Sequence, residues 1–328
     1  MSSPHQGGTP NAPVGAPGVV SAQSLAAQIR RAVGTTVRGK PQVVDLAVAA
    51  MLSGGHLLVE DLPGTGKTLL AKSMAVAIGG RFGRIQCTPD LLPTDVTGTS
   101  IYRSETGEWD FRPGPIFSNV VLIDEINRAS PRTQSAMLQP MEERQLSLDS
   151  RTWSMPDPFF CVATQNPFGQ VGTFPLPESQ LDRFAMVISI GLPDREAERE
   201  IITGAGGVDM LSSLAPVAEP EQVAAAVRDT ARIHVDPKIV EYVLDLVEAT
   251  RKSTHLSQGA SPRASVSLMH LARAHAAVHE RDYVVPDDVQ AVFVPALAHR
   301  VMISGRVDTS AAAEVLTWLM TQVPIPMS

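Results

Sequence analysis

The segment Glu60–Thr68, which reads EDLPGTGKT, has the residue types and spacing of a loop that binds phosphate groups. Its two central glycines would let the backbone curl so that several N–H groups point at one anion. The lysine would reach the terminal phosphates of a nucleoside triphosphate, and the threonine hydroxyl would bind Mg²⁺. We therefore expect ATP and Mg²⁺ as cofactors, held by Pro63, Gly64, Thr65, Gly66, Lys67, Thr68 and Leu69.

The segments on both sides of this loop favour the same interpretation. The apolar run His56–Val59 precedes it and is typical of a buried strand. The run Leu69–Ile78 follows it and predicts a helix that ends at two glycines. An ordinary glycine-rich turn would explain the glycines, but not the adjacent Lys-Thr pair.

One position departs from the usual motif, which has a glycine five residues before the second loop glycine. Asp61 stands there in this chain. A carboxylate beside a triphosphate is unfavourable unless it points away from the nucleotide. Asp61 therefore leaves open the hypothesis of a scaffold that is switched by ATP but does not hydrolyse it.

Polar side chains follow two further apolar runs. Asp124 and Glu125 follow the run Val120–Ile123, and Asn166 follows Phe159–Thr164. Ligands bind at the carboxyl ends of the strands in open α/β sheets, so we expect these side chains near the phosphate loop. Asp124 would help to hold Mg²⁺, and Glu125 would activate the attacking water. Asn166 would bind that water and the γ-phosphate, although both segments could also be ordinary turns.

The rest of the chain predicts two domains after an N-terminal tail. Residues 1–19 are rich in Gly, Pro and Ser and are expected to be disordered, without the features of a signal peptide. Residues 20–193 alternate apolar strands with helices, which predicts an α/β core with a parallel sheet covered on both faces. Residues 194–328 are helical in pattern, with helix starts at Asp194, Pro220, Pro237, Pro262, Pro286 and Ser310.

Composition limits the classes of partner that we expect this chain to bind. The net charge of -7 argues against nucleic acid as the main partner. No apolar run approaches the roughly 18 residues that a membrane helix needs. Cys87 and Cys161 fall in apparent strands, so we expect buried, reduced thiols in a cytoplasmic protein rather than a disulfide. His275 and His279 have the spacing of metal ligands, but we interpret them as ordinary helix residues because no carboxylate of the zinc-protease motif stands between them.

Five segments together resemble the signatures of the MoxR family of AAA+ ATPases. They are Asp124–Ala129 (DEINRA), Pro140–Gln145 (PMEERQ), Ala163–Pro167 (ATQNP), Leu176–Phe184 (LPESQLDRF) and Gly259–Ala264 (GASPRA). With the phosphate loop, the matches keep the order and spacing of the family from about residue 37 to residue 263. Two predicted hairpins, Ser100–Phe111 and Gln145–Ser154, also match insertions of the family, which in the wider clade face a central channel.

The resemblance implies a fold and a set of roles. The fold would be a AAA+ P-loop core with a C-terminal all-helical lid, and the nucleotide would lie between them. The matching residues would be Lys67, Thr68 and Asp124 as nucleotide and metal ligands, Glu125 as the catalytic carboxylate, Asn166 as the first sensor, Arg183 as the arginine finger and Arg263 as the second sensor. Each arginine, taken alone, would more simply be a surface or ion-paired residue.

The resemblance also implies partners. An arginine finger acts on the nucleotide of the next subunit, so we expect a homo-oligomeric ring, usually of six subunits. The activity would be ATP hydrolysis by a chaperone that remodels or matures a client protein, possibly one with a von Willebrand A-type domain. A related motor that acts on DNA is the alternative within the same superfamily.

Overall fold

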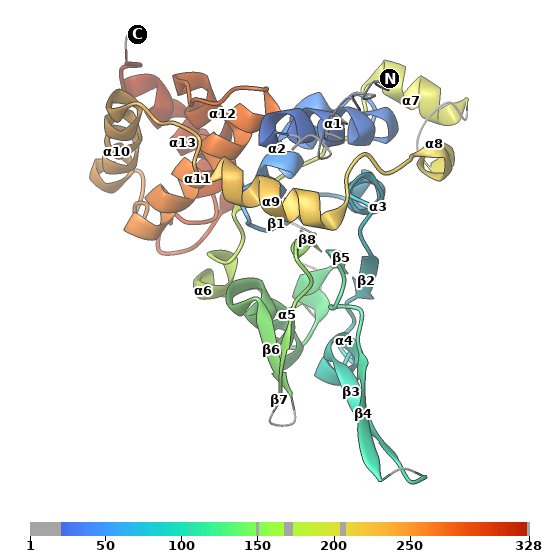
Figure 1. The fold of residues 1–328 in the computed structure, drawn as a ribbon. Coiled ribbons are helices and arrows are strands. Elements are labelled where there is room, and N and C mark those ends of the chain that lie inside the picture. The colour runs from blue at the N-terminus through green and yellow to red at the C-terminus, as the bar shows by residue number, and fades with distance from the viewer. Residues whose placement is uncertain (1–20, 106, 149–150, 167–172, 204–207, 327–328) are drawn as a thin grey trace, which may run out of the picture.

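A five-stranded parallel sheet forms the centre of the computed structural model, which describes residues 21–105, 107–148, 151–166, 173–203 and 208–326 (Figure 1). The strand order is β2-β5-β8-β1-β9, and every neighbouring pair is parallel. The strands are β1 (Leu57–Glu60), β2 (Phe82–Gln86), β5 (Val120–Asp124), β8 (Phe160–Gln165) and β9 (Met186–Ile188). The predicted α/β class with a parallel sheet is confirmed. The predicted tail, 1–19, lies outside the described residues.

Side chains on the two faces of this sheet enter two separate hydrophobic clusters. On one face, Leu57 and Val59 pack in a cluster that also contains residues of the first helices. On the other face, Leu58 packs with Met137 and Leu138 of the helix Pro131–Glu143. This alternation follows from the period of two along a strand. Because both faces are covered, the inner strands β5, β8 and β1 are apolar along most of their length and carry polar groups at their ends, whereas the edge strand β2 carries the exposed Arg84.

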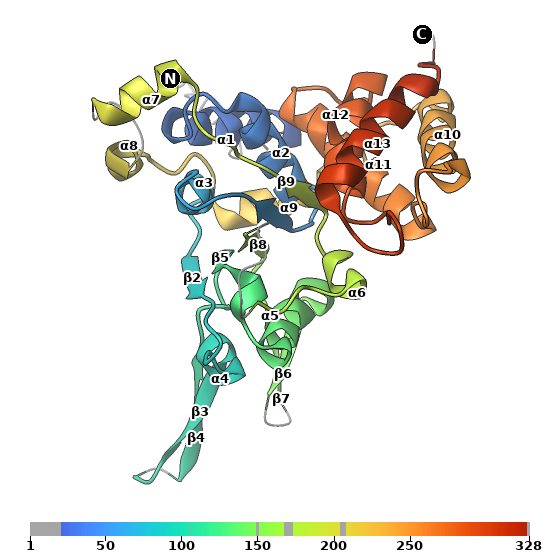
Figure 2. The same cartoon turned by 180° about the vertical axis from the view of Figure 1, so that it is seen from behind.

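The helices of the first half are α1 (Ala22–Thr36), α2 (Pro41–Leu52), α3 (Lys67–Ala77), α4 (Pro93–Thr97), the short 3₁₀ turn η1 (Ile126–Arg128), α5 (Pro131–Glu143) and α6 (Glu178–Leu181). Those of the second half are α7 (Arg195–Ile202), α8 (Val208–Ser213), α9 (Pro220–Thr230), α10 (Pro237–Lys252), α11 (Pro262–Val278), α12 (Pro286–Leu297) and α13 (Thr309–Gln322). The helical C-terminal half is confirmed. Figure 2 shows α10 to α13 gathered beside the sheet-bearing half.

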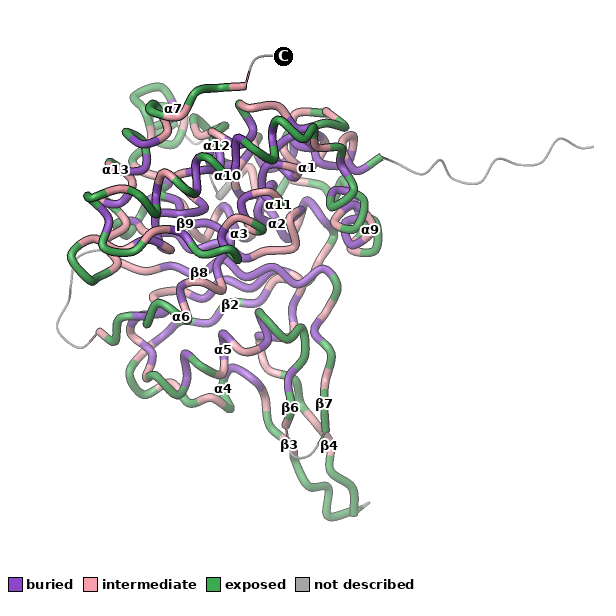
Figure 3. The backbone as a smooth tube through the Cα atoms, turned by 90° about the vertical axis from the view of Figure 1, so that its left-hand side faces the viewer, coloured by how far each residue is buried: buried purple, intermediate pink, exposed green. Residues whose placement is uncertain are grey.

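The helical half packs directly on the first two helices of the chain. Helix α11 lies against both α1 and α2, and α9 also lies against them. One hydrophobic cluster therefore runs without a break from Leu25 of α1 to Leu316 of α13. Figure 3 shows many buried segments, in purple, in the upper body, where they alternate with exposed and intermediate ones.

Two hairpins leave the body on the opposite side of the sheet from α1 and α2 (Figures 1 and 2). The first consists of β3 (Gly98–Arg103) and β4 (Glu108–Pro113), and the second of β6 (Gln145–Leu148) and β7 (Arg151–Ser154). Both were predicted from the sequence. The first hairpin is largely exposed toward its tip (Figure 3).

Two further sequence predictions concern buried groups and membranes. Cys87 and Cys161 are buried free thiols, as expected. Burial raises the pKa of Cys87 to about 12, with a smaller contribution from Asp124, and burial also raises the pKa of Cys161. Within the described ranges, no helix has the length and apolar character needed to cross a membrane.

A buried carboxylate fixes α12 to α11. Asp288 is fully buried, and it accepts hydrogen bonds from Nη1 and Nη2 of Arg281 and from the Val285 amide at 2.9 Å. His275 Nδ1 of α11 lies 2.7 Å from its Oδ1 atom. Burial raises the pKa of Asp288, but the hydrogen bonds from His275, Arg281 and Val285 lower it by more, so its net pKa is below the ordinary value.

We expect the substitution Asp288→Asn to lower the free energy of unfolding by about 3 kcal/mol, because it leaves buried charge without its partner. Since the pKa of Asp288 is depressed on folding, its contribution is present above the unfolded pKa of about 4 and is lost as the pH falls through the folded value. Urea denaturation of both proteins at several pH values measures this. The neighbouring exposed residue supplies the control, Asp287→Asn, and equal stability of the two variants would contradict the prediction.

Candidate functional site

The phosphate loop lies between β1 and α3, where the sequence places it. Gly64 and Gly66 have φ values of +87° and +93°, which residues with a Cβ atom rarely adopt. Helix α3 begins directly after the second of these glycines, so its N-terminus faces the loop. Lys67 Nζ donates to the carbonyl oxygens of Asp61 and Leu62, at 2.8 and 2.9 Å. The loop therefore has the backbone curl that a phosphate site requires.

The side chain of Asp61 is held by backbone amides. It is 8% exposed, and its Oδ2 atom accepts hydrogen bonds from the amides of Ile190 and Gly191 at 2.8 and 2.7 Å. Its Oδ1 atom accepts from the Leu62 amide at 3.0 Å. The carboxylate thus ties the phosphate loop to the end of β9. These amide hydrogen bonds occupy both carboxylate oxygens, which weakens the objection that a charge at this position must repel a bound triphosphate.

A cavity of about 730 Å³ lies in front of the loop and collects most of the predicted site residues. Its volume is in the range usual for ligand pockets. The lining residues are Asp61, Pro63, Gly64, Gly66, Lys67, Thr68, Leu69, Gln86, Asp124, Glu125, Thr164, Gln165, Asn166 and Ile201. They come from the loop, the carboxyl ends of β2, β5 and β8, and helix α7. The structure therefore brings the phosphate loop, the acidic pair and the predicted first sensor together.

The acidic pair is held by a short chain of hydrogen bonds. Thr164 Oγ1 donates to Asp124 Oδ1 at 2.8 Å and accepts from the amide of Glu125 at 2.9 Å. This contact fixes the start of the turn in which Glu125 has a φ of +55°. Two arginines pair with the carboxylates, Arg84 with Asp124 and Arg128 with Glu125, both at 2.8 Å. No role was predicted from the sequence for these three partners, although Arg128 and Thr164 lie within the family segments Asp124–Ala129 and Ala163–Pro167.

The donor set of the cavity fits a magnesium ion bound with a nucleotide. The Thr68 hydroxyl and the Asp124 carboxylate both line the cavity. Mg²⁺ takes oxygen ligands and usually binds through one or two protein groups together with substrate phosphates.

A smaller cavity of about 100 Å³ lies beside the loop and was not predicted. It is lined by Gly64 and Gly66 of the loop, by the connector 37–40 between α1 and α2, and by Gly191 and Ile201. In the sequence, the short connector 37–40 has an ordinary composition, so it did not indicate a cavity.

Arg183 and Arg263 do not line the cavity of their own chain. They meet instead at one carboxylate, since Glu142 Oε2 lies 3.4 Å from Arg183 Nε and its Oε1 lies 3.1 Å from Arg263 Nη2. Of the described residues beyond Pro193, only Ile201 of α7 lines the cavity, and none of α10 to α13 does. In this chain the cavity is therefore lined by the sheet-bearing half and by Ile201 of α7, and the position of the nucleotide between core and lid stays a prediction.

The turn that carries Arg183 is fixed from the helical half by residues that sequence reasoning missed. Arg300 follows α12, its side chain is 5% exposed, and its Nε lies 2.9 Å from Asp182 Oδ1. It also donates to the carbonyl oxygens of Asp182 and Phe184, and His299 Nε2 lies 3.0 Å from the latter. Nothing in the local sequence around Arg300 marks this contact.

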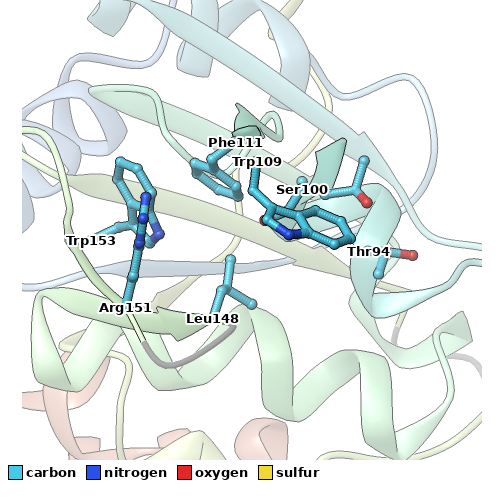
Figure 4. Close-up of a pocket in the computed structure, with 9 residues that line it drawn as sticks. Thr94, Ser100, Trp109, Phe111, Leu148, Arg151 and Trp153 are labelled. Atoms are coloured by element: carbon cyan, nitrogen blue, oxygen red, sulfur yellow. The ribbon is translucent and has the colours of Figure 1, made fainter. Parts of the chain in front are cut away.

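A separate cavity of about 550 Å³ lies between the two hairpins (Figure 4). Trp109 and Phe111 of the first hairpin face Trp153 and Leu148 of the second, with Arg151 at its edge (Figure 4). The Phe111 and Trp153 rings stack with centroids 4.4 Å apart, whereas Trp109 is 63% exposed. None of these residues lines the phosphate-loop cavity.

Comparison with known proteins finds a family match for each half of the chain. Residues 56–186 match the model of the ATPase family associated with various cellular activities (AAA), and residues 248–316 match the AAA lid domain. Chaperone MoxR1 of Mycobacterium tuberculosis is 41% identical, over 86% of this chain and 78% of its own length. Protein MoxR of Paracoccus denitrificans is 32% identical, over 90% and 94%.

The solved structures give the same result. A crystal structure of a candidate ATPase from Cytophaga hutchinsonii superposes with a TM-score of 0.84 at 32% identity, over 93% of this chain and 96% of that one. The predicted combination of a nucleotide-binding α/β core and a helical lid is therefore shown by sequence and by structure.

We expect the substitution Asp61→Gly to weaken ATP binding about tenfold, although it restores the glycine of the usual motif. The change removes the bonds to Ile190 and Gly191 and should cost about 2–3 kcal/mol of unfolding free energy. Titration with a fluorescent ATP analogue and thermal unfolding measure the two effects. Asp90→Gly, at an exposed loop position, is the control, and tighter ATP binding by Asp61→Gly would contradict the prediction.

Proposed function

The chain belongs to the MoxR family of AAA+ ATPases, and from that premise we propose that it hydrolyses ATP in a ring of identical subunits and uses the cycle to remodel or mature partner proteins. One observation carries the proposal. The phosphate loop, Asp124, Glu125 and Asn166 share a cavity, whereas Arg183 and Arg263 lie outside it. A site divided in this way is complete only where two subunits meet.

Within one subunit, the loop amides and Lys67 would bind the β- and γ-phosphates. Lys67 holds two loop carbonyl oxygens in the structure, so it would exchange these for phosphate oxygens. Thr68 and Asp124 would hold Mg²⁺, which neutralises negative charge that develops on the phosphates. Asp124 would then shift from its ion pair with Arg84.

Glu125 would accept the proton of the attacking water. Its backbone is fixed by Thr164, while its carboxylate pairs with the partly exposed Arg128. To reach a water near the γ-phosphate, the carboxylate would leave Arg128, a surface pair that costs little to separate. Asn166, at the end of the neighbouring strand, would orient the water and the γ-phosphate.

The purine base would lie in the smaller cavity beside the loop. That cavity lies between the α1–α2 connector and the turn after β9, and Ile201 lines both cavities. Its apolar contacts come from Val37, Leu69, Ile190 and Ile201. A planar base packs well against apolar side chains of this kind, whereas the polar cavity in front of the loop suits the charged phosphates.

Arg183 and Arg263 would complete the pocket of the adjacent subunit in a ring, which for this family we expect to contain six subunits. The exposed aromatic side chains of the hairpins, Tyr102 and Trp109, are suited to contact a client chain. The client itself, a von Willebrand A-type domain by the family resemblance, and a cytoplasmic location remain part of this proposal.

We expect Glu125→Gln to retain ATP binding within about threefold and to reduce phosphate release at least ~100-fold, because the amide cannot accept the proton of the water. Equilibrium binding of radiolabelled ATP and a phosphate-release assay on the assembled protein measure both quantities. Glu248→Gln, at an exposed residue of α10, serves as the control. Unchanged turnover in Glu125→Gln would remove Glu125 from its proposed role.

We expect Lys67→Ala and Arg183→Ala to be nearly inactive separately and to regain activity when mixed. A subunit with Arg183→Ala has an intact pocket that a neighbouring Lys67→Ala subunit can supply with arginine. In an equal, random mixture about a quarter of the subunit contacts combine both intact parts, so about a quarter of wild-type activity should return. Light scattering would establish that the mixed rings form.

The matched control is a mixture of Lys67→Ala with Glu125→Gln, whose defects fall in the same pocket and should not complement. If mixed rings of Lys67→Ala and Arg183→Ala stayed inactive, or if isolated subunits were as active as the assembly, the shared site would be wrong.

A further inference from the structure

Three arginines and two carboxylates form a cluster where four parts of the chain meet. Glu142 lies near the end of α5, Asp182 and Arg183 lie in the turn between α6 and β9, Arg263 lies at the start of α11, and Arg300 follows α12. None of them lines the phosphate-loop cavity. The cluster carries one more positive than negative charge, so it attracts an anion.

The two carboxylates divide the arginines between them. Asp182 pairs with Arg300 at 2.9 Å and with Arg263 Nε at 3.5 Å. Glu142 pairs with Arg263 at 3.1 Å and with Arg183 at 3.4 Å. In the described part of the chain, Glu142 is the carboxylate that neutralises Arg183. It is therefore the residue that bridges Arg183 and Arg263.

One end of the cluster is fixed and the other faces solvent. Arg300 is almost fully buried and is held by backbone carbonyl oxygens, whereas the side chains of Glu142 and Arg263 are 44% and 59% exposed. Arg183 Nε is buried and has no hydrogen-bond partner among the described residues. The charge of Glu142 therefore orients the Arg183 guanidinium, and the Nε–H group of Arg183 can still donate a hydrogen bond.

We propose that Glu142 is a positioning residue: its carboxylate holds Arg183 and Arg263 side by side so that both contact one terminal phosphate on the adjacent subunit. This inference rests on the proposed function. Two guanidinium groups repel each other, and the shared carboxylate offsets that repulsion. Groups that are already in place when charge develops on the phosphate stabilise the transition state more than groups that must first be ordered.

The test uses two adjacent glutamates of α5. Glu143 accepts a hydrogen bond from Gln139 Nε2 at 3.0 Å and forms no ion pair with an arginine within the described ranges, so Glu143→Gln removes the same charge without touching the cluster. We expect Glu142→Gln to lower kcat for ATP in the assembled protein about two- to fivefold, the range for loss of a partly exposed ion-pair partner. The KM for ATP should change less than twofold, because Glu142 does not line the cavity.

A double-mutant cycle separates positioning from a general effect on folding. In an Arg263→Ala background there is one arginine fewer to hold, so Glu142→Gln should lower kcat by a clearly smaller factor. Glu142→Asp, which keeps the charge on a shorter side chain, should restore part of kcat. Equal kcat values for Glu142→Gln and Glu143→Gln would overturn the inference, and so would an identical loss in both backgrounds.

The outcomes also distinguish this inference from the function on which it rests. If Arg183→Ala keeps full kcat, the proposed shared site fails, and the inference about Glu142 fails with it. If Arg183→Ala abolishes turnover while Glu142→Gln behaves as Glu143→Gln, only the role of Glu142 is refuted.

Discussion

Burial of the parallel sheet on both faces is the constraint on which the site depends. Strands covered on both sides cannot carry unpaired polar groups along their length, so Val120–Ile123 and the start of β8 are entirely apolar. Polar residues are tolerated where each strand ends. Because the strands are parallel, these ends lie at one edge, and Asp124, Thr164 and Asn166 meet there beside the phosphate loop. The chemistry of the cavity is therefore a consequence of the way the core is built.

Local sequence predicted those parts that local physics determines. The apolar runs located the strands of the central sheet, and Asp194, Asp236 and Ser261 cap their helices as expected, each accepting a backbone hydrogen bond. The hairpins were also predicted from alternation and turn residues. The short helices α4, α6 and α8 were missed, because a segment of four to six residues is too short to show a helical period.

Contacts between distant segments were beyond prediction. Asp61 looked like a defect in the motif, and its role depends on amides 129 and 130 residues further along the chain. The pairing of Arg183 and Arg263 through Glu142 depends on how α5, α11 and the turn after α6 come together. No motif around Arg300 indicates that it supports Asp182. Such partners are set by the packing of the two halves, which a single sequence does not show.

The cationic groups of the proposed reaction share one property. Lys67 binds two loop carbonyl oxygens, Arg84 and Arg128 pair with the acidic residues of the cavity, and Arg183 pairs with Glu142. The first three contacts each occupy a group that the reaction would need, and most are partly exposed and therefore cheap to exchange, whereas Glu142 holds Arg183 in position. A nucleotide in the cavity can compete for the first three, but only a neighbouring subunit can bring a phosphate to Arg183. Hydrolysis would thus depend on nucleotide binding and on assembly together, which is the coupling that a remodelling machine requires.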